Sequence, residues 1–336
     1  MLIAGMACLC SAASSIAFAI AEKDLWGAHN KELFRFMEAD GEGLPTFKTA
    51  DGQYIAYRAF NQKCGDTAVI IVNGRTEFQL KYAEIIWDLY RRGYCVFSYD
   101  HRGQGLSSRL LEDHQKGYIK HFSDYLTDLG EFDRRIVRTK PFNRVYLLGH
   151  SMGGLIASQY AAKAESNLAG LILLAPMLDI KTAGVPSALA HLVVWYQTKS
   201  GRGERYSLRQ GPWDPKRDSF ETNKVTSSEA RYEFTKEVYA RHPETVMGGC
   251  TNRWLLEAIR ATDKSLALAS KIRAPILLLQ AAKDTFVKNP RQVKFCSRAG
   301  NCALRVVANS KHEILFEADP IRDYALGEIF RFIDTH

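Results

Sequence analysis

Short apolar runs alternate with amphipathic stretches over most of the 336-residue chain. The runs predict strands that are covered on both faces, and they lie at residues 68–72, 95–99, 145–148, 170–175, 276–280 and 303–307. Apolar positions three or four apart predict the intervening helices, among them residues 25–40, 82–92, 122–137 and 320–333. This alternation predicts an α/β fold, in which helices cover both faces of a mostly parallel central sheet.

Two segments depart from this alternation. Residues 46–60 predict a hairpin, because Asp51-Gly52 is a turn signal between strand-like segments. Residues 178–262 are long, aromatic and charged, and they predict a helical cap insertion over the carboxyl edge of the sheet. We therefore expect the α/β core in two parts, residues 22–177 and 263–336.

The first 21 residues carry no charged side chain and end in two small-x-small sites, at residues 17–19 and 19–21. A charged segment, Glu22-Lys23-Asp24, follows directly. This pattern is typical of a secretory signal peptide, and its length also suits an uncleaved membrane anchor of about 20 residues. The expected location is therefore exported, either periplasmic or secreted, or membrane-attached, in preference to the cytoplasm.

Composition and charge limit the classes of binding partner that the sequence predicts. The apolar fraction of 46% and charged fraction of 24% are ordinary for a globular protein. The net charge of +8 comes from scattered Lys and Arg, without a basic tract or zinc-finger spacing. Nucleic acid is therefore not expected, and neither a metal nor another cofactor is predicted. Attraction to an anionic membrane surface stays open.

Seven cysteines are present, and five remain if residues 1–21 are removed. An odd number cannot pair completely within one chain. Cys95 lies in an apolar run and is expected to be a buried packing residue. Cys296 and Cys302 flank a short loop, where a disulfide and two free thiols are both open interpretations.

The most informative motif follows the apolar run at residues 145–148. Residues 149–153 read Gly-His-Ser-Met-Gly, and small residues continue into a predicted helix. A serine between a strand and a helix, flanked by glycines, is the nucleophile-elbow pattern. The sharp turn places the hydroxyl of Ser151 clear of the sheet, and a Cβ at either flanking position would crowd it. Ser151 is the predicted nucleophile.

A serine needs a base and an acid, and in this architecture they follow it in the order acid, then histidine. His312 is the predicted base because it lies in the loop after the last predicted strand. Asp284 is the predicted acid because it follows the strand at residues 276–280. Asp263 is the alternative acid, although its place before that strand favours a helix cap.

A developing oxyanion needs two backbone N–H donors. The N–H of Met152, directly after the nucleophile, is one prediction. The N–H of Arg75, in the loop after residues 68–72, is the other. For the Arg75 side chain, contact with an anionic head group and exposure to solvent are both open interpretations.

These residues resemble one known family. Residues 81–84, 100–105, 149–154 and 312–317 are similar to the bacterial lysophospholipases of the monoacylglycerol-lipase-like, or serine aminopeptidase-like, α/β-hydrolases. The resemblance implies an α/β-hydrolase fold, a triad of Ser151, Asp284 and His312, and an oxyanion hole of Arg75 and Met152. One departure is Asn73, which stands where monoacylglycerol lipases have the His of their His-Gly loop.

The expected activity is serine ester hydrolysis of a single-chain lipid ester, a lysophospholipid or a monoacylglycerol, through an acyl-enzyme. An aromatic cap is expected to hold the acyl chain in an apolar pocket. A short-chain carboxylesterase or an aminopeptidase-like serine hydrolase is the alternative on the same triad. A non-catalytic binding protein on a hydrolase scaffold is the alternative from another class.

Overall fold

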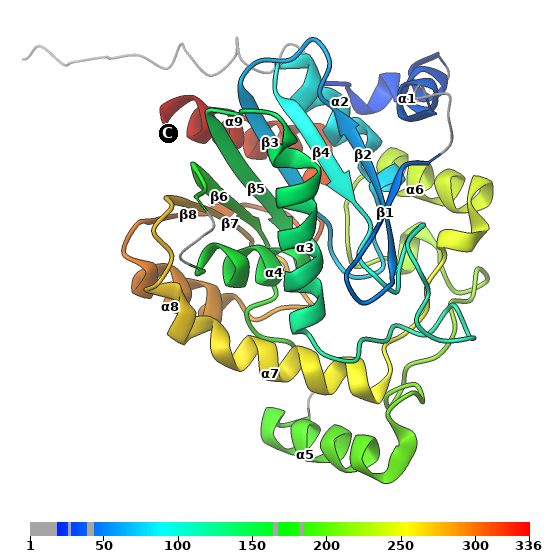
Figure 1. The fold of residues 1–336 in the computed structure, drawn as a ribbon. Coiled ribbons are helices and arrows are strands. Elements are labelled where there is room, and N and C mark those ends of the chain that lie inside the picture. Colours follow the sequence, from blue (N-terminus) through cyan, green and yellow to red (C-terminus); the bar gives the residue numbers. More distant parts are fainter. Residues whose placement is uncertain (1–18, 26–27, 39–43, 164–166, 182–184) are drawn as a thin grey trace, which may run out of the picture.

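The computed structural model describes residues 19–25, 28–38, 44–163, 167–181 and 185–336 (Figure 1). Within these residues one sheet of eight strands runs in the order β1-β2-β4-β3-β5-β6-β7-β8. The strands are β1 (Thr46–Lys48), β2 (Tyr54–Phe60), β3 (Thr67–Val72), β4 (Cys95–Tyr99), β5 (Arg144–His150), β6 (Gly170–Leu174), β7 (Ile276–Ala281) and β8 (Cys302–Val307).

The sheet is mostly parallel, as the sequence predicts. The pairs β1–β2 and β2–β4 are antiparallel, and every other neighbouring pair is parallel. Thr46 lies opposite Ala56, so residues 46–60 form the expected hairpin. The α/β-hydrolase fold class is therefore confirmed.

Helices cover both faces of this sheet (Figure 1). They are α1 (Ala28–Glu38), α2 (Ala83–Arg91), α3 (Ser123–Arg135), α4 (Met152–Ala161), α5 (Ser187–Gln197), α6 (Glu229–Arg241), α7 (Asn252–Ala269), α8 (Asn289–Ala299) and α9 (Asp319–Thr335). Shorter helical turns lie at Glu22–Asp24, Gln79–Tyr82, Val137–Thr139, Thr198–Arg202, Phe220–Thr222, Pro243–Thr245 and Ile314–Phe316.

Strand β3 shows how two cores arise from one sheet. Val69 and Ile71 belong to the cluster that contains the buried residues of α1, α2 and α9. Ile70 and Val72 belong to the opposite cluster, with α3, α4 and α8. Successive side chains of a strand point to opposite faces, so a continuous apolar run is what a doubly covered strand requires.

The predicted cap segment divides in space. Helix α5 lies outside α7 and contacts it, whereas α6 contacts the turns at Glu22–Asp24 and Gln79–Tyr82 (Figure 1). Helix α7 packs against α4 and α8, so it is part of the layered body. The expected limit at residues 262–263 falls inside α7, and the domain limits stay predictions.

Two disulfides among the described residues tie the fold locally. Cys296 is bonded to Cys302, which selects the disulfide from the two interpretations that the sequence left open. Cys64 is bonded to Cys95, so the expectation for Cys95 is wrong in one respect: it is buried, but its sulfur is paired. Cys250 is a buried free thiol. Most of the predicted leader, residues 1–18, lies outside the described residues.

Candidate active site

The elbow serine lies between β5 and α4, as its motif predicts. Ser151 has φ 50° and ψ −114°, a strained backbone for a residue with a side chain. Two backbone bonds hold it there: the Ser151 N–H donates to Leu174 O at 3.0 Å, and the Met177 N–H donates to Ser151 O at 2.8 Å. Strand β6 and the loop after it therefore fix the turn.

The flanking glycines are required by close contact. A Cβ on Gly149 would lie 2.8 Å from Gly153 O. A Cβ on Gly153 would lie only 1.9 Å from Val72 O at the end of β3. Because backbone atoms cannot move aside as a flexible side chain can, only glycine fits. The elbow consequently sits directly against the loop that contains Arg75.

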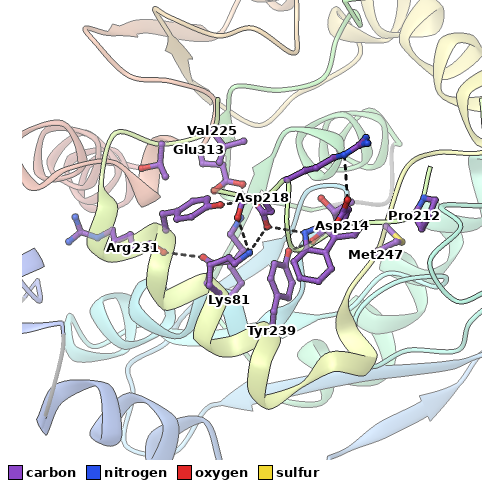
Figure 2. Close-up of a pocket in the computed structure, with 16 residues that line it drawn as sticks. Lys81, Pro212, Asp214, Asp218, Val225, Arg231, Tyr239, Met247 and Glu313 are labelled. Atoms are coloured by element: carbon purple, nitrogen blue, oxygen red, sulfur yellow. Dashed lines mark hydrogen bonds and ion pairs between the residues drawn. The ribbon is translucent and has the colours of Figure 1, made fainter. Parts of the chain in front are cut away.

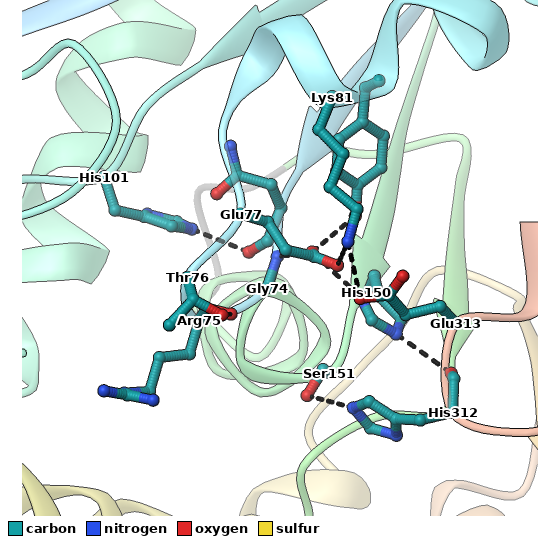
Figure 3. Close-up of polar contacts among 12 residues, drawn as sticks. Gly74, Arg75, Thr76, Glu77, Lys81, His101, His150, Ser151, His312 and Glu313 are labelled. Atoms are coloured by element: carbon teal, nitrogen blue, oxygen red, sulfur yellow. Dashed lines mark hydrogen bonds and ion pairs between the residues drawn. The ribbon is translucent and has the colours of Figure 1, made fainter. Parts of the chain in front are cut away.

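The three predicted triad residues meet at the carboxyl edge of the sheet. His312 Nε2 lies 2.9 Å from Ser151 Oγ, and His312 Nδ1 lies 2.6 Å from Asp284 Oδ2. Figure 3 shows the Ser151 hydroxyl facing the His312 ring. All three residues are buried. The Phe286 and Val287 N–H groups donate to Asp284 Oδ1 at 2.7 and 3.0 Å.

This arrangement keeps the acid ionised. Burial opposes the charge of Asp284, but its hydrogen bond with His312 and the two backbone donors outweigh burial, so its pKa lies below the ordinary value. A charged carboxylate on Nδ1 fixes the imidazole tautomer in which Nε2 is free to accept a proton from Ser151. The geometry is that of a nucleophile, a base and an orienting acid.

The predicted oxyanion donors come from two adjoining segments. Met152 is the first residue of α4, where N–H groups have no partner inside the helix and the helix dipole is positive. Arg75 lies in the loop after β3, against which Gly153 packs. Arg75 and Met152 therefore lie in the two segments that meet at the elbow, and their oxyanion role stays a prediction.

The sequence missed a buried ionic cluster behind the base. Glu77 accepts hydrogen bonds from His150 Nδ1 at 3.0 Å and from Tyr82 Oη at 2.7 Å. Lys81 Nζ lies 3.4 Å from Glu77 and 2.5 Å from Glu313 (Figure 3). The four-residue spacing of Glu77 and Lys81 was the available signal, but an exposed helical pair has the same spacing.

Charges in this cluster stabilise one another. Burial disfavours ionisation of Glu77, but the positive charges of His150 and Lys81 more than compensate, so its pKa lies below its usual range. Burial likewise opposes protonation of His150, yet the Glu77 charge raises the pKa of His150 above its ordinary value. The cluster lies directly against the backbone of the base, since His150 Nε2 also bonds to His312 O.

The Asp-His-Arg-Gly-Gln-Gly segment supports the oxyanion loop. His101 Nε2 donates to Asn73 O at 3.0 Å, and Gln104 Nε2 donates to Gly74 O at 2.8 Å. The Asn73 side-chain amide donates to Tyr99 O at 2.9 Å. Asn73, the departure from the family pattern, thus has a structural role: its side chain ties the loop to β4.

A cavity of about 410 Å³ opens beside the catalytic loops (Figure 2). Asp218 lies in its wall and accepts hydrogen bonds from Trp213 Nε1, Tyr232 Oη and Lys236 Nζ. The wall also includes Lys81 and Glu313. This lining mixes aromatic and charged groups, so it differs from the apolar acyl pocket that the sequence predicts.

Within the described residues, no group of three His, Cys, Asp or Glu side chains is arranged to hold a metal ion.

Comparisons with known proteins identify relatives of this chain. A family model described as serine aminopeptidase, S33 matches residues 64–319. Lysophospholipase L2 of Escherichia coli is 34% identical over 298 residues, which cover 86% of this chain and 87% of the relative. Probable lysophospholipase L2 of Haemophilus influenzae is 32% identical, covering 91% and 99%.

A solved structure shares the fold. The crystal structure of a soluble variant of monoglyceride lipase from Saccharomyces cerevisiae, in complex with a substrate analogue, superposes with a TM-score of 0.71. It is 19% identical and covers 88% of this chain and 95% of its own. At this identity the likeness concerns the fold alone.

Proposed function

The chain belongs to the serine aminopeptidase family of α/β-hydrolases, and we propose that it cleaves the single acyl ester of a lysophospholipid or a monoacylglycerol. The observation that carries this proposal is the continuous hydrogen-bonded chain from Ser151 through His312 to Asp284. The two lysophospholipase L2 relatives, which align over most of the chain, support the substrate class.

Acyl transfer begins at Ser151. His312 Nε2 takes the proton of Ser151 Oγ as that oxygen attacks the ester carbonyl carbon. The Met152 and Arg75 N–H groups stabilise the resulting oxyanion. His312 then gives the proton to the leaving glycerol oxygen, and the ester bond breaks. Asp284 stabilises the imidazolium that forms between these two transfers.

Deacylation repeats the sequence with water. His312 takes a proton from a water molecule, whose oxygen attacks the acyl carbonyl carbon of the acyl-enzyme. The second tetrahedral intermediate collapses when His312 returns the proton to Ser151 Oγ, and the fatty acid leaves. The net reaction consumes one water and one ester and needs no other reactant.

Ser151→Ala tests the mechanism. We expect ester hydrolysis to disappear, labelling of the protein by a fluorophosphonate to be lost, and the thermal unfolding midpoint to remain close to that of the wild type. Retained hydrolysis by this variant would exclude the mechanism. Wild-type protein that a fluorophosphonate does not label would indicate the non-catalytic alternative.

The family description also favours a second candidate, an aminopeptidase-like hydrolase or a short-chain carboxylesterase. A nitrophenyl ester series of increasing acyl length, run beside lysophospholipid, monoacylglycerol and aminoacyl-nitroanilide substrates, separates the candidates. Preference for long acyl chains supports the lipid assignment. Preference for acetyl esters or for the anilide overturns it.

The proposal extends to contact with a lipid surface through α5. Leu189, Leu192, Val193 and Tyr196 follow helical spacing and are each about half exposed. Helix α5 contains no Asp, Glu, Lys or Arg, although it includes His191, and Lys199 and Arg202 follow it. An apolar helix face beside basic groups is suited to an anionic lipid interface. None of the helices in the described part of the chain has the length and apolar character of a membrane span.

Liposome flotation tests this contact. Replacing Leu192 and Val193 with Glu is expected to reduce recovery with anionic vesicles, while hydrolysis of a water-soluble nitrophenyl ester continues. Replacing Lys199 and Arg202 with Glu isolates the electrostatic contribution to vesicle binding. Unchanged flotation in both variants would remove α5 from the proposal.

The protein is also proposed to act outside the cytoplasm, exported or membrane-attached. The leader-like residues 1–21 and two disulfides support this location, since disulfides persist mainly in oxidising compartments. Fractionation followed by N-terminal sequencing of the native protein tests it. A reduced cytoplasmic form that begins at Met1 would contradict it.

A further inference from the structure

Arg75 presents a cation that its surroundings leave uncompensated. Its Nη2 donates to Gly248 O at 2.7 Å, and its Nε is buried with no hydrogen-bond partner among the described residues. The side chain is half-buried and points away from Glu77 and Lys81 (Figure 3). In the part of the chain that the structure describes, it forms no ion pair with a carboxylate.

Other buried arginines show what the protein does with a structural cation. Arg102 is paired with Asp51 and Asp128. Arg231 is paired with Glu84 and Asp319, and Arg322 with Asp88. These fully buried guanidinium groups are therefore offset by carboxylates, as the energetics of burial require. Arg109, which is half-buried like Arg75, is instead satisfied by three backbone oxygens, those of Gly103, Gly105 and Glu244. Arg75, at the edge of the catalytic centre, has one such acceptor, Gly248 O.

Neighbouring groups form a rigid slot for this guanidinium. It lies over the Trp254 ring, 5.0 Å from the ring centre. Gly117 passes so close that a Cβ there would lie 2.7 Å from Arg75 Nη2. Trp254 is itself held, since its Nε1 donates to Tyr125 Oη at 3.3 Å. The aromatic face and the glycine preorganise the cation without neutralising it.

A second unsatisfied donor belongs to the same region. The Tyr206 hydroxyl is buried and has no hydrogen-bond partner among the described residues. Burial and the charge of Asp113 raise the pKa of Tyr206, and the Arg75 charge acts against that rise. Lys116 lies over the Tyr206 ring, at 5.7 Å, and is paired with Asp113 at 3.6 Å. Because that pair compensates itself, the Arg75 guanidinium and the Tyr206 hydroxyl are the donors left for an anion here.

Spacing along the substrate agrees with this chemistry. In a one-chain phospholipid, phosphorus lies about six covalent bonds from the ester carbonyl carbon, and the Arg75 guanidinium carbon lies about six covalent bonds from its own backbone nitrogen. If the Arg75 backbone N–H donates to the ester carbonyl oxygen, the guanidinium can therefore reach as far along the substrate as the phosphate. A monoacylglycerol has no phosphate to place there.

We propose that the Arg75 side chain, with the Tyr206 hydroxyl, binds the phosphate of the substrate head group and gives the enzyme its preference for lysophospholipid over monoacylglycerol. The inference rests on the proposed lipid-ester function. Arg75 thus has two separable roles, because its backbone N–H serves the oxyanion in any variant and its side chain serves the head group alone.

The decisive measurement is a ratio. The kcat/KM for lysophosphatidylglycerol is divided by that for the monoacylglycerol of the same acyl chain. Arg75→Met is expected to lower this ratio by about 10- to 100-fold, the loss typical of a hydrogen-bonded charge. Arg75→Lys keeps the charge but not the two-pronged geometry, so it retains part of the ratio. Tyr206→Phe lowers it less than Arg75→Met.

Two control variants locate the effect. Arg205→Met removes an exposed cation from the same cap segment, and the ratio is expected to stay within about 2-fold of the wild type. Lys236→Met removes a cation from the cavity of Figure 2. An unchanged ratio in Arg75→Met, or equal losses on both lipids, overturns the proposal. A ratio that falls with Lys236→Met in place of Arg75→Met also overturns it.

An inhibition assay separates this proposal from the proposed function. Glycerol 3-phosphate and glycerol are compared as inhibitors of nitrophenyl ester hydrolysis by wild-type protein and by Arg75→Met. Stronger inhibition by glycerol 3-phosphate, lost in the variant, supports phosphate binding even if the wild type prefers short esters. Equal inhibition by both compounds in the wild type contradicts it.

Discussion

His150 Nε2 donates a hydrogen bond to the backbone oxygen of the catalytic-base candidate His312, at 3.1 Å. The other ring nitrogen, Nδ1, faces Glu77 Oε2 at 3.0 Å. A carbonyl oxygen and a carboxylate oxygen both accept, so both ring nitrogens must donate, which only the imidazolium form can do. The residue before the nucleophile is therefore a buried cation that holds the base in place.

Glu77→Gln tests this positioning role. The amide keeps the side-chain shape but removes the charge that raises the pKa of His150, so we expect kcat to fall about 10-fold with little change in KM. A matched variant, Arg205→Met, changes an exposed charge and should leave kcat unaltered. Equal effects on kcat and KM would indicate general unfolding of the site instead.

The pH dependence of this cluster has a defined sign. His150 has a raised pKa in the folded protein, so its stabilising contribution is complete below the unfolded value of about 6.5 and is lost as pH rises through the folded value. In Glu77→Gln the folded pKa of His150 is lower, so this contribution should be smaller and its loss complete at a lower pH. Urea unfolding from pH 6 to pH 9 measures it, and coincident profiles for both proteins would contradict the assignment.

His101 should act in the opposite direction. Burial lowers its pKa to about 4, so the folded protein holds it neutral while it donates to Asn73 O. Its contribution is present above about pH 6.5 and is lost as pH falls towards 4. His101→Gln should reduce the stability difference between pH 7 and pH 5 by about 2 kcal/mol. An unaltered difference in urea unfolding would exclude this.

Asp284→Asn should show that Asp284 orients the imidazole of His312 and does not contribute to substrate binding. The amide cannot stabilise the imidazolium and favours the wrong tautomer, so kcat should fall about 10³- to 10⁴-fold while KM changes little. The alternative acid, Asp263, supplies the control. Its replacement by Asn should leave kcat within about 2-fold, and a larger loss at residue 263 than at residue 284 would reverse the assignment.

Gly153→Ala should inactivate the enzyme, because the new Cβ would meet Val72 O at 1.9 Å and push the elbow away from the oxyanion loop. A displacement of that kind typically lowers activity by about 100-fold or more. Gly211→Ala is the matched control, since no atom lies within 4 Å of its added Cβ. Full activity in Gly153→Ala would mean that the elbow and β3 are not in contact.

The two disulfides should differ in their effect on stability. Cys64 and Cys95 are 31 residues apart, and Cys296 and Cys302 only 6. Loop-closure entropy predicts losses of about 3–4 kcal/mol for Cys64→Ser and about 2 kcal/mol for Cys302→Ser. Unfolding in urea without reductant measures both. A larger loss for Cys302→Ser would contradict this order.

The fold and the triad were accessible from the sequence because they depend on local pattern and chain order. An apolar run followed by Gly-His-Ser-Met-Gly places Ser151 after a strand, whatever the distant chain does. Parallel strands bring their carboxyl ends to one edge. The loops after β5, β7 and β8 therefore had to carry Ser151, Asp284 and His312 to the same place.

Only the tertiary structure decided which distant side chains touch. Glu77 and the His312 backbone oxygen, which face the two ring nitrogens of His150, lie 73 and 162 residues away along the chain. Cys95 was expected to be a buried packing residue, and only the structure shows that its sulfur is bonded to Cys64. The sequence left the environment of the Arg75 side chain open between solvent and an anionic group. The structure places it beside Gly117 and over the Trp254 ring, with no carboxylate paired to it among the described residues. Such contacts depend on three-dimensional distance and on burial, which periodicity and motif spacing along one chain do not specify.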